Sequence, residues 1–362
     1  VQKELMSKKK YQDVIDWLIN EIENGNYAEG EKIPSEFELA EKFNYSRQTI
    51  RRATDELVNN KYLSRIKGSG TYVGYRFRKK QYNTIAVVVT YVDNYIFPNT
   101  LKGLSDILTA NGYSMSVYYT DDCVLKEREN LKLLIADNHI DGLIIEPTKS
   151  ALPSPNLDLY QKIIDMKLPM LFINAIYPHF NSPCIRINDQ KIGEESVNYL
   201  FQQGHKKIGC IFQADDIQGH MRYKGFIKGL KKANLKFNQK QICWIDAVSY
   251  QNPNQLFSYF LSRLKGCTAV VCYNDFIAEK FIGFCKGQGI RIPEDLSIVG
   301  IDDADYSATL IPPLTTFRHP QYHLGELAAK SILKMIDNTN FDANYIFQSQ
   351  LIIRESVINR KD

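Results

Sequence analysis

No run of apolar side chains in this 362-residue sequence is long enough to cross a lipid bilayer. The longest runs, such as residues 85–89, fall far short of the roughly 20 residues that a membrane-spanning helix requires. The lysine-rich residues 1–10 are followed by Tyr11, Gln12 and Asp13 and not by the apolar stretch of a secretory signal. We therefore expect a protein that stays in the cytoplasm and has no membrane partner.

The sequence also lacks the patterns on which metal and catalytic chemistry commonly depend. Its seven cysteines are odd in number, scattered and without a C-x-x-C pair, so we interpret them as reduced thiols of the hydrophobic core. It contains no G-x-S-x-G, no H-E-x-x-H and no Walker loop. His319 and His323 have the spacing of metal ligands, but Pro320 lies between them and no third ligand is evident. We expect no metal, no cofactor and no enzymatic activity.

Excess positive charge is confined to one short segment. Residues 42–80 carry eleven basic and two acidic side chains, a net charge of +9, whereas residues 1–41 carry five basic and ten acidic ones. The totals of 45 and 41 leave 29 of each sign in the remaining 282 residues. A polarised module joined to a neutral one indicates that the first part meets a polyanion and the second does something else.

Three helices are predicted before residue 60. Residues 11–24 have apolar side chains at helical spacing, and Gly25 stops the pattern. Ser35 followed by Glu38 can form a capping box that begins a second helix. Ser46 can cap a third helix that runs to about residue 58. This third helix has an apolar side and an opposite side that carries Gln48, Arg51 and Arg52.

A basic hairpin is predicted directly after the third helix. Residues 62–66 and 71–73 alternate as strands around the glycine-rich tip at residues 67–70. Two short helices, the second with an Arg and Gln face, describe a helix-turn-helix that can enter a major groove, and the hairpin is its wing. The simpler alternative is that these arginines are a solvated helix face.

Residues 10–73 resemble the GntR-type winged helix, through residues 32–36, 46–53 and 68–73. The resemblance implies that certain side chains approach DNA: Glu36, Arg47, Gln48, Arg51, Lys67 and Gly68. Glu36 could accept from a cytosine amine, orient Arg51, or simply complement the helix dipole. Lys10 could contact a phosphate or belong to a solvated tail.

From residue 84 the sequence alternates between strand and helix patterns. The candidate strands are residues 85–90, 115–119, 142–146, 169–174, 208–213, 242–246, 269–273 and 297–301. This alternation predicts an α/β fold with parallel sheets covered on both faces, and its length suits two doubly wound lobes.

Ligands of such sheets lie beyond the carboxyl ends of the strands, so the polar residues that follow each strand are candidates. They are Tyr91, Tyr95, Glu146, Lys149, Asn174, Asp215, Asp216, Asn274, Asp275, Asp302 and Asp303, joined by Arg222 near a helix start and His319 in a later crossover. Planar polar groups among aromatic rings suit a small neutral polyol. Taken singly, each such residue could be only a helix cap or a turn former.

Residues 84–358 resemble the LacI/GalR effector domain, through residues 141–147, 204–208, 222–226, 273–275, 293–303 and 313–316. That resemblance implies a periplasmic-binding-protein fold, with Arg222 and Asp275 on a sugar. The expected organisation is a winged helix over 8–74, a linker over 75–83 and an effector domain over 84–362.

The hybrid of a GntR-type head and this effector domain resembles the arabinose repressors of Gram-positive bacteria. The resemblance implies a homodimeric repressor that L-arabinose releases from operator DNA. The residue chemistry alone leaves other neutral sugars, such as xylose or galactose, open. A sugar-active enzyme and a transport receptor are the alternatives from other classes, but the first lacks a catalytic motif and the second requires a secretion signal.

Overall fold

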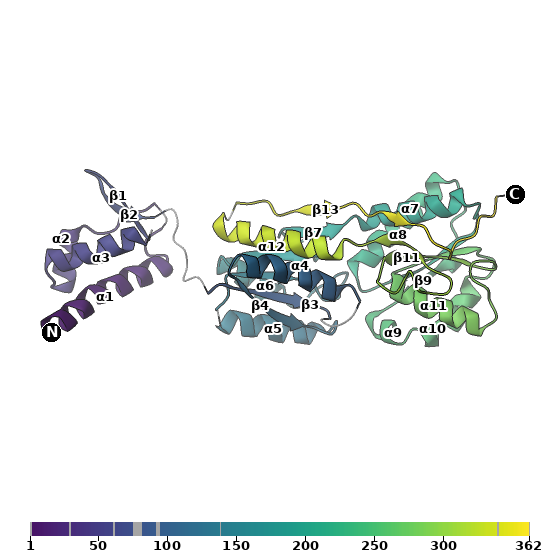
Figure 1. The fold of residues 1–362 in the computed structure, drawn as a ribbon, viewed down its shortest axis with the longest axis horizontal. Helices are drawn as coiled ribbons and strands as arrows, with labels where there is room; N and C mark the ends of the chain where they lie inside the picture. The colour runs from purple at the N-terminus through teal and green to yellow at the C-terminus, as the bar shows by residue number, and fades with distance from the viewer. Residues whose placement is uncertain are drawn as a thin grey trace. The chain divides into compact units, whose positions relative to one another are not determined.

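The computed structural model describes residues 2–28, 30–60, 62–74, 82–91, 95–137, 139–338 and 340–361. The chain divides into two compact units, residues 1–81 and 82–362 (Figure 1). Most of the predicted linker, residues 75–81, lies outside the described residues. Within the described part of the chain, no helix combines the length and the apolar character needed to span a membrane.

The first unit contains three helices and a two-stranded hairpin. The elements are α1 (Gln2–Glu23), α2 (Glu36–Phe43), α3 (Arg47–Asn59), β1 (Leu63–Ile66) and β2 (Gly70–Val73). The predicted helix-turn-helix and wing are confirmed, although α1 begins at Gln2 and not at Tyr11. The apolar pattern from Tyr11 onward gives no signal for the residues before it, where lysine and glutamate have favourable helix propensity.

Two serine caps fix the geometry of the helix-turn-helix. Ser35 Oγ accepts from the Glu38 amide at 3.3 Å while Glu38 Oε2 accepts from the Ser35 amide at 2.7 Å, which is the predicted capping box. Ser46 Oγ accepts from the Thr49 amide at 3.2 Å. Between the two helices, Asn44 has a left-handed backbone with φ 52°, which ends α2 and turns the chain into α3.

The second unit consists of two lobes, each built on a six-stranded sheet. The first sheet has the order β13-β7-β6-β5-β3-β4 and is parallel throughout. The second has the order β14-β12-β11-β10-β8-β9 and is parallel except for β14. The chain passes from one lobe to the other after β7, after β12 and after β13.

The first lobe contains β3 (Thr84–Val89), α4 (Phe97–Ala110), β4 (Ser114–Tyr119), α5 (Val124–Asp137), β5 (Gly142–Ile145), α6 (Leu157–Asp165), β6 (Met170–Ile173), β7 (Cys184–Ile187), α12 (Gln321–Asp337) and β13 (Tyr345–Phe347). Alternate residues of β3 pack on opposite faces of the sheet. Val87 lies with α4 and α12, and Val88 lies with α5 and α6. Both faces are therefore covered, as predicted.

The second lobe contains α7 (Asp189–Gln202), β8 (Ile208–Gln213), α8 (Ile217–Lys232), the short 3₁₀ helix η1 (Gln239–Gln241), β9 (Ile242–Ile245), α9 (Ala247–Gln251), α10 (Asn254–Arg263), β10 (Ala269–Cys272), α11 (Asp275–Gly287), β11 (Ser297–Asp302), β12 (Thr315–Arg318) and β14 (Leu351–Ile352). All eight predicted strands are confirmed; β7, β12, β13 and β14 were not predicted. The seven cysteines are free thiols, and all but Cys123 are buried, as the interpretation of core thiols requires.

Candidate nucleic-acid interface and ligand pocket

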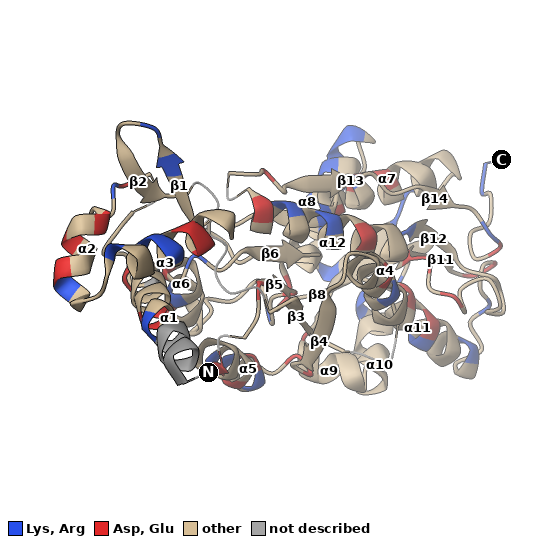
Figure 2. Cartoon of the chain, turned by 60° about the vertical axis from the view of Figure 1, so that its left-hand side comes forward, with Lys and Arg blue, Asp and Glu red and all other residues tan. Residues whose placement is uncertain are grey.

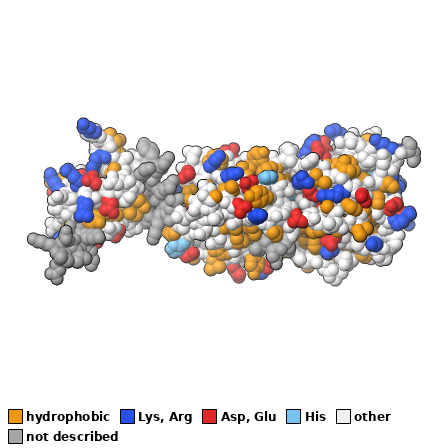
Figure 3. Space-filling view, viewed as in Figure 1, with side chains coloured by type: hydrophobic (Ala, Val, Ile, Leu, Met, Phe, Trp, Pro, Cys, Tyr) orange, Lys and Arg blue, Asp and Glu red, His pale blue; other side chains and the backbone are white. Residues whose placement is uncertain are grey.

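The outer face of α3 presents a basic surface on the first unit. Arg47, Gln48 and Arg51 are all exposed there, and Lys67 and Gly68 are exposed at the tip of the β1–β2 hairpin. Gly68 has φ 79°, a left-handed conformation that glycine adopts without strain. Figure 2 marks basic residues in blue along the ribbons of α3 and the hairpin, and Figure 3 shows basic side chains exposed on one face of this unit.

Glu36 organises two arginines of this basic surface. Its Oε2 accepts from Arg51 Nε at 3.1 Å and from Arg51 Nη2 at 2.9 Å, and its Oε1 accepts from Arg65 Nη2 at 3.3 Å. Arg65, on β1, also donates to Asp55 at 2.7 Å. Of the roles considered for Glu36, this geometry favours the orientation of Arg51. Arg65 was not predicted, although its place on the strand that leads into the wing was a usable signal.

Lys10 and Arg47 each lie near an aromatic ring. The Lys10 ammonium is 5.4 Å from the centre of the Tyr45 ring, and the Arg47 guanidinium is 5.0 Å from the centre of the Phe37 ring. Both side chains are exposed. Such contacts restrict where the charge can lie and leave its donors free for an anion.

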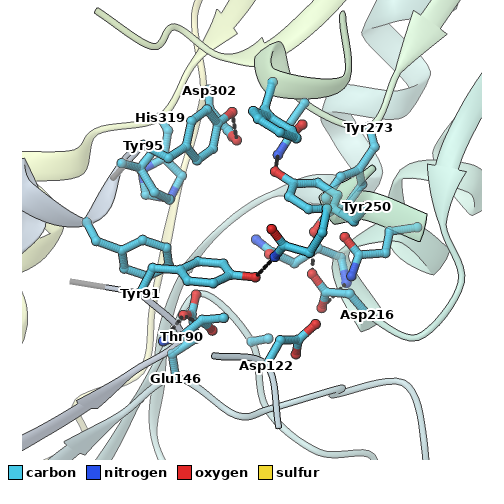
Figure 4. A pocket seen from close by; sticks show the side chains of 18 of the residues that line it. Thr90, Tyr91, Tyr95, Asp122, Glu146, Asp216, Tyr250, Tyr273, Asp302 and His319 are labelled. Atoms are coloured by element: carbon cyan, nitrogen blue, oxygen red, sulfur yellow. Dashed lines mark hydrogen bonds between the residues drawn. The ribbon is translucent and has the colours of Figure 1, made fainter. Parts of the chain in front are cut away.

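In the second unit, a cavity of about 350 Å³ lies between the carboxyl ends of the two sets of strands. Nine residues predicted for the ligand site line it: Tyr91, Tyr95, Glu146, Lys149, Asp216, Arg222, Asn274, Asp302 and His319. The lining also includes residues that were not predicted, among them Thr90, Asp122, Gln213, Tyr250, Gln251, Tyr273, Phe276 and Tyr306. Figure 4 shows the side chains of Tyr91, Tyr250 and Tyr273 around this space.

Arg222 is held rigidly at one wall of the cavity. Its Nε donates to Asp189 Oδ1 at 2.9 Å, its Nη1 donates to the Tyr273 carbonyl at 2.5 Å, and its Nη2 is 3.6 Å from Asp302 Oδ1. Burial by itself would lower the pKa of Arg222, but Asp189 and Asp302 together outweigh it and raise that pKa. The pair can form because Gly193 lets α7 approach the backbone of α8; a Cβ at Gly193 would be 2.0 Å from the Arg222 carbonyl oxygen.

Glu146 and Asn174 form a second buried polar group. Glu146 Oε2 accepts from the Thr90 amide at 3.1 Å and from Thr90 Oγ1 at 2.6 Å, and its Oε1 accepts from Asn174 Nδ2 at 2.8 Å. Asn174 Oδ1 is 3.2 Å from His319 Nε2. Burial raises the pKa of Glu146, although the three hydrogen bonds it accepts oppose that rise.

Some buried polar atoms in the lining lack a hydrogen bond. Within the described residues, Asp302 Oδ1, His319 Nδ1 and Tyr306 Oη make no hydrogen bond. An unsatisfied buried polar atom costs about 1–3 kcal/mol, so atoms of this kind mark places where a ligand can bind favourably.

Comparisons with known proteins agree with both modules. Residues 10–73 match the gntR family of bacterial regulatory proteins, and residues 197–357 match the periplasmic binding protein-like domain. The arabinose metabolism transcriptional repressor of Geobacillus stearothermophilus is 34% identical over 95% of each chain. That of Halalkalibacterium halodurans is 34% identical over 97% of each chain. The chain belongs to this family of transcriptional repressors.

Solved structures share the fold of the repressor. A complex of the transcriptional regulator CelR with cellobiose has a TM-score of 0.68 at 20% identity, covering 86% of this chain and 90% of that one. The regulator CcpA of Lactococcus lactis has a TM-score of 0.68 at 22% identity, covering 76% and 98%. The chain is a DNA-binding repressor with a small-molecule domain, and not an enzyme, as predicted.

Four residues predicted for the ligand site do not line the main cavity of the repressor: Asp275, Asp303, Asn174 and Asp215, of which Asp215 accepts from the Ala247 amide at 2.9 Å. Asp275 turns inward: its carboxylate accepts from Ser307 Oγ at 2.5 Å and Thr316 Oγ1 at 2.6 Å and so holds the segment after β11. Burial raises the pKa of Asp275 to about 7. Asp303 pairs with Arg318 at 2.9 Å and Arg354 at 2.6 Å. Asn174 lies behind Glu146 and lines a separate cavity of about 270 Å³.

The lining of the main cavity is acidic. Among the residues that the structure describes, five carboxyl side chains and two basic side chains line the cavity. The carboxyl groups are those of Asp122, Glu146, Asp216, Glu279 and Asp302, and the basic groups are those of Lys149 and Arg222. Burial, with repulsion from Asp215 and Asp216, raises the pKa of Asp122 to about 7. Such a site disfavours an anionic ligand because the arginine is already compensated by Asp189 and Asp302.

Proposed function

We propose that the main cavity binds L-arabinose and that this sugar releases the repressor from operator DNA. The observation that carries the proposal is the pair of buried atoms without a partner among the described residues, His319 Nδ1 and Tyr306 Oη, in a lining with aromatic walls. Hydroxyl groups can satisfy such atoms, and a ring face can cover the apolar side of a sugar. The names of the relatives support arabinose among the neutral sugars.

The acidic lining argues against phosphorylated or carboxylated effectors. Five carboxyl groups surround a space in which Arg222 already has two carboxylate neighbours. Lys149, the other basic side chain of the lining, lies 3.7 Å from the Asp215 carboxylate. Transfer of an anion into this site would therefore add repulsion from the carboxyl groups, while both basic side chains already have carboxylate neighbours. A neutral pentose avoids this cost and needs only hydrogen-bond geometry.

Contacts between the lobes give the sugar a way to change the shape of the protein. Tyr91 Oη, in the first lobe, accepts from Gln251 Nε2 in the second at 2.5 Å. Tyr95 Oη donates to Asp302 Oδ2 at 2.6 Å. A sugar held by both lobes adds further bridges and favours their closed arrangement. For release, the sugar must bind the non-DNA-binding state more tightly, because equal affinity shifts no equilibrium.

We also infer that two copies of the chain act together in the cytoplasm. Two winged helices match a roughly palindromic operator, since operator symmetry mirrors protein symmetry. Closure of the lobes would then move the paired heads out of register with the half-sites.

A gel-shift experiment tests the proposed function. Operator fragments are first selected from random-sequence DNA by the sugar-free protein and then titrated with L-arabinose, D-xylose and D-galactose. We expect a retarded band of the protein–DNA complex, and we expect L-arabinose to dissociate this complex at a lower concentration than the other two sugars. Release by none of them, or equal release by all three, would contradict the assignment of the effector.

A further inference from the structure

We infer that Glu146 and Asn174 fix the tautomer of His319, so that His319 Nδ1 acts as a hydrogen-bond acceptor for one hydroxyl group of the effector. The inference deepens the proposed function and rests on it, because a hydroxyl-bearing ligand must occupy the cavity. It assigns to Glu146 and Asn174 a positioning role behind the sugar contact.

The direction of the hydrogen-bond chain begins at Thr90. Its backbone amide and its hydroxyl both lie within reach of Glu146 Oε2, at 3.1 and 2.6 Å. These two donors favour the ionised form of Glu146 by lowering its pKa against the effect of burial, and an ionised carboxylate can only accept. The other carboxylate oxygen therefore also accepts, and the partner at 2.8 Å must be the amide nitrogen of Asn174. The orientation of the Asn174 side chain follows from this bond.

The carbonyl oxygen of Asn174 then faces His319. It lies 3.2 Å from His319 Nε2, and since an amide oxygen cannot donate, Nε2 must carry the proton. In a neutral imidazole the other nitrogen has a free lone pair. His319 Nδ1 is buried in the lining and, among the described residues, has no partner of its own.

The charge state of His319 agrees with this geometry. Burial lowers the pKa of His319 to about 4; Asp302 opposes that shift, and Arg222 adds to it. The charged groups that face the ring are therefore Asp302 from β11 and Arg222 from α8, with Glu146 beyond Asn174. At neutral pH the ring is uncharged and can accept at Nδ1.

The position of His319 connects this contact to both lobes. The residue follows β12 of the second sheet and precedes α12, which packs on the first sheet, so it lies where the chain crosses between lobes. Asn174 and Glu146 belong to the first lobe. A ligand hydroxyl that donates to Nδ1 is thus held at the crossover, and a site built for that hydroxyl rejects an analogue without it.

Two variants of the full-length protein test the inference: the first reverses the direction of the hydrogen bonds from Thr90 to His319, and the second restores it. In Glu146→Gln, the two Thr90 donors keep the amide oxygen near them, so the new NH₂ group faces Asn174. Asn174 then turns its own NH₂ toward His319, and the proton moves to Nδ1. Adding Asn174→Asp restores the original direction of the hydrogen bonds, because an aspartate can only accept, both from the new amide at position 146 and from His319 Nε2.

The tautomer of His319 is measured at pH 8 from the NMR resonances of its imidazole nitrogens. These resonances are assigned by their loss in His319→Gln. His323→Gln is the control, because His323 is exposed on α12. We expect Nε2–H in the wild type, Nδ1–H in Glu146→Gln and Nε2–H again in the double variant. We expect L-arabinose affinity to fall about 10- to 100-fold in Glu146→Gln and to recover at least partly in the double variant.

The tautomer is measured without sugar, so the tautomer assignment and the proposal of L-arabinose as the effector can be contradicted separately. An Nδ1–H ring in the wild type, or no reversal in Glu146→Gln, overturns the inference even if L-arabinose still releases DNA. An Nε2–H ring that reverses as expected, in a protein that binds none of the sugars, supports the tautomer assignment and removes L-arabinose as the effector. Loss of affinity without tautomer reversal would show a purely structural role and also overturn the inference.

Discussion

At the scale of single residues, substitutions of Arg51 and Lys67 are expected to weaken DNA binding in different ways. Arg51 lies on the outer face of α3, where a bidentate contact to a base is possible, so Arg51→Ala should cost about 1–3 kcal/mol at the operator and relax sequence choice. Lys67→Ala at the hairpin tip should weaken binding to all sequences and lower the salt slope by about one.

Fluorescence anisotropy on operator and scrambled DNA at several salt concentrations separates these two effects. Arg291→Ala is a matched control, because Arg291 is exposed in the second unit and pairs with Asp295. If Arg51→Ala left the preference for operator over scrambled DNA intact, the recognition helix would be misplaced.

Asp122 should make the stability of the repressor depend on pH. Burial, with Asp215 and Asp216 nearby, raises its pKa to about 7, whereas an unfolded chain releases the same proton near pH 4. Between these values the folded protein holds a proton that the unfolded chain has lost, so stability falls as pH rises from about 4 to about 7. Asp122→Asn removes this loss and should raise the melting temperature more at pH 8 than at pH 5.

Substitution of Asp158 should change the melting temperature in the opposite direction. Its pKa is lowered by hydrogen bonds from Arg128, so Asp158→Asn should lower the melting temperature at pH 8, if only slightly at this exposed site. An equal gain from Asp122→Asn at both pH values would exclude a raised pKa for Asp122.

Sequence reasoning located much of the cavity because parallel strands end at one edge. Glu146 and Asn274 follow strands and point into the space between the lobes, as that rule predicts. The same rule also selected Asp275, which does not line the cavity, because a polar residue after a strand can also turn inward and hold a loop. Tyr250 and Tyr306 were missed because neither directly follows a predicted strand: Tyr250 lies in α9, and Tyr306 lies between β11 and β12.

At the scale of elements, the capping box of α2 should contribute to the stability of the helix-turn-helix. Ser35→Ala removes an N-cap at a cost of about 1 kcal/mol, and Ser35→Gly should cost only a few tenths. Amide hydrogen exchange of the full chain measures this locally. Protection of α2 should fall about fivefold in Ser35→Ala and much less in Ser35→Gly. No loss of protection in Ser35→Ala would mean that the serine hydroxyl does not stabilise α2.

The missed strands β13 and β14 differ in burial from the predicted strands β5 and β8, whereas β7 and β12 were missed although most of their residues are buried. β5 and β8 are buried along their whole length, and their continuous apolar runs were readable in the sequence. β13 is short and mostly exposed, and β14 has only two residues. Such edge strands are defined by the neighbour they pair with, and that neighbour is distant in sequence. Local pattern carries no signal for them.

At the scale of the whole molecule, two phenol groups should affect DNA release differently. Tyr306 Oη contacts the cavity from the second lobe alone, and among the described residues it has no protein partner. Tyr306→Phe should leave sugar-free operator binding unchanged and raise the L-arabinose concentration for half release about five- to tenfold. The maximum release should stay the same, because a contact from one lobe is made in both states.

Tyr91→Phe instead removes the hydrogen bond between Tyr91 and Gln251, which joins the two lobes. Loss of an interlobe bond destabilises the closed arrangement by about 1 kcal/mol, so it shifts the equilibrium before any sugar binds. If closure is the state that leaves DNA, sugar-free operator affinity should rise, by up to about fivefold. Gel shifts over a sugar titration give both quantities for each variant. A weaker operator complex in Tyr91→Phe would show that the closed arrangement is the one that holds DNA, and it would reverse the direction of coupling proposed for the sugar.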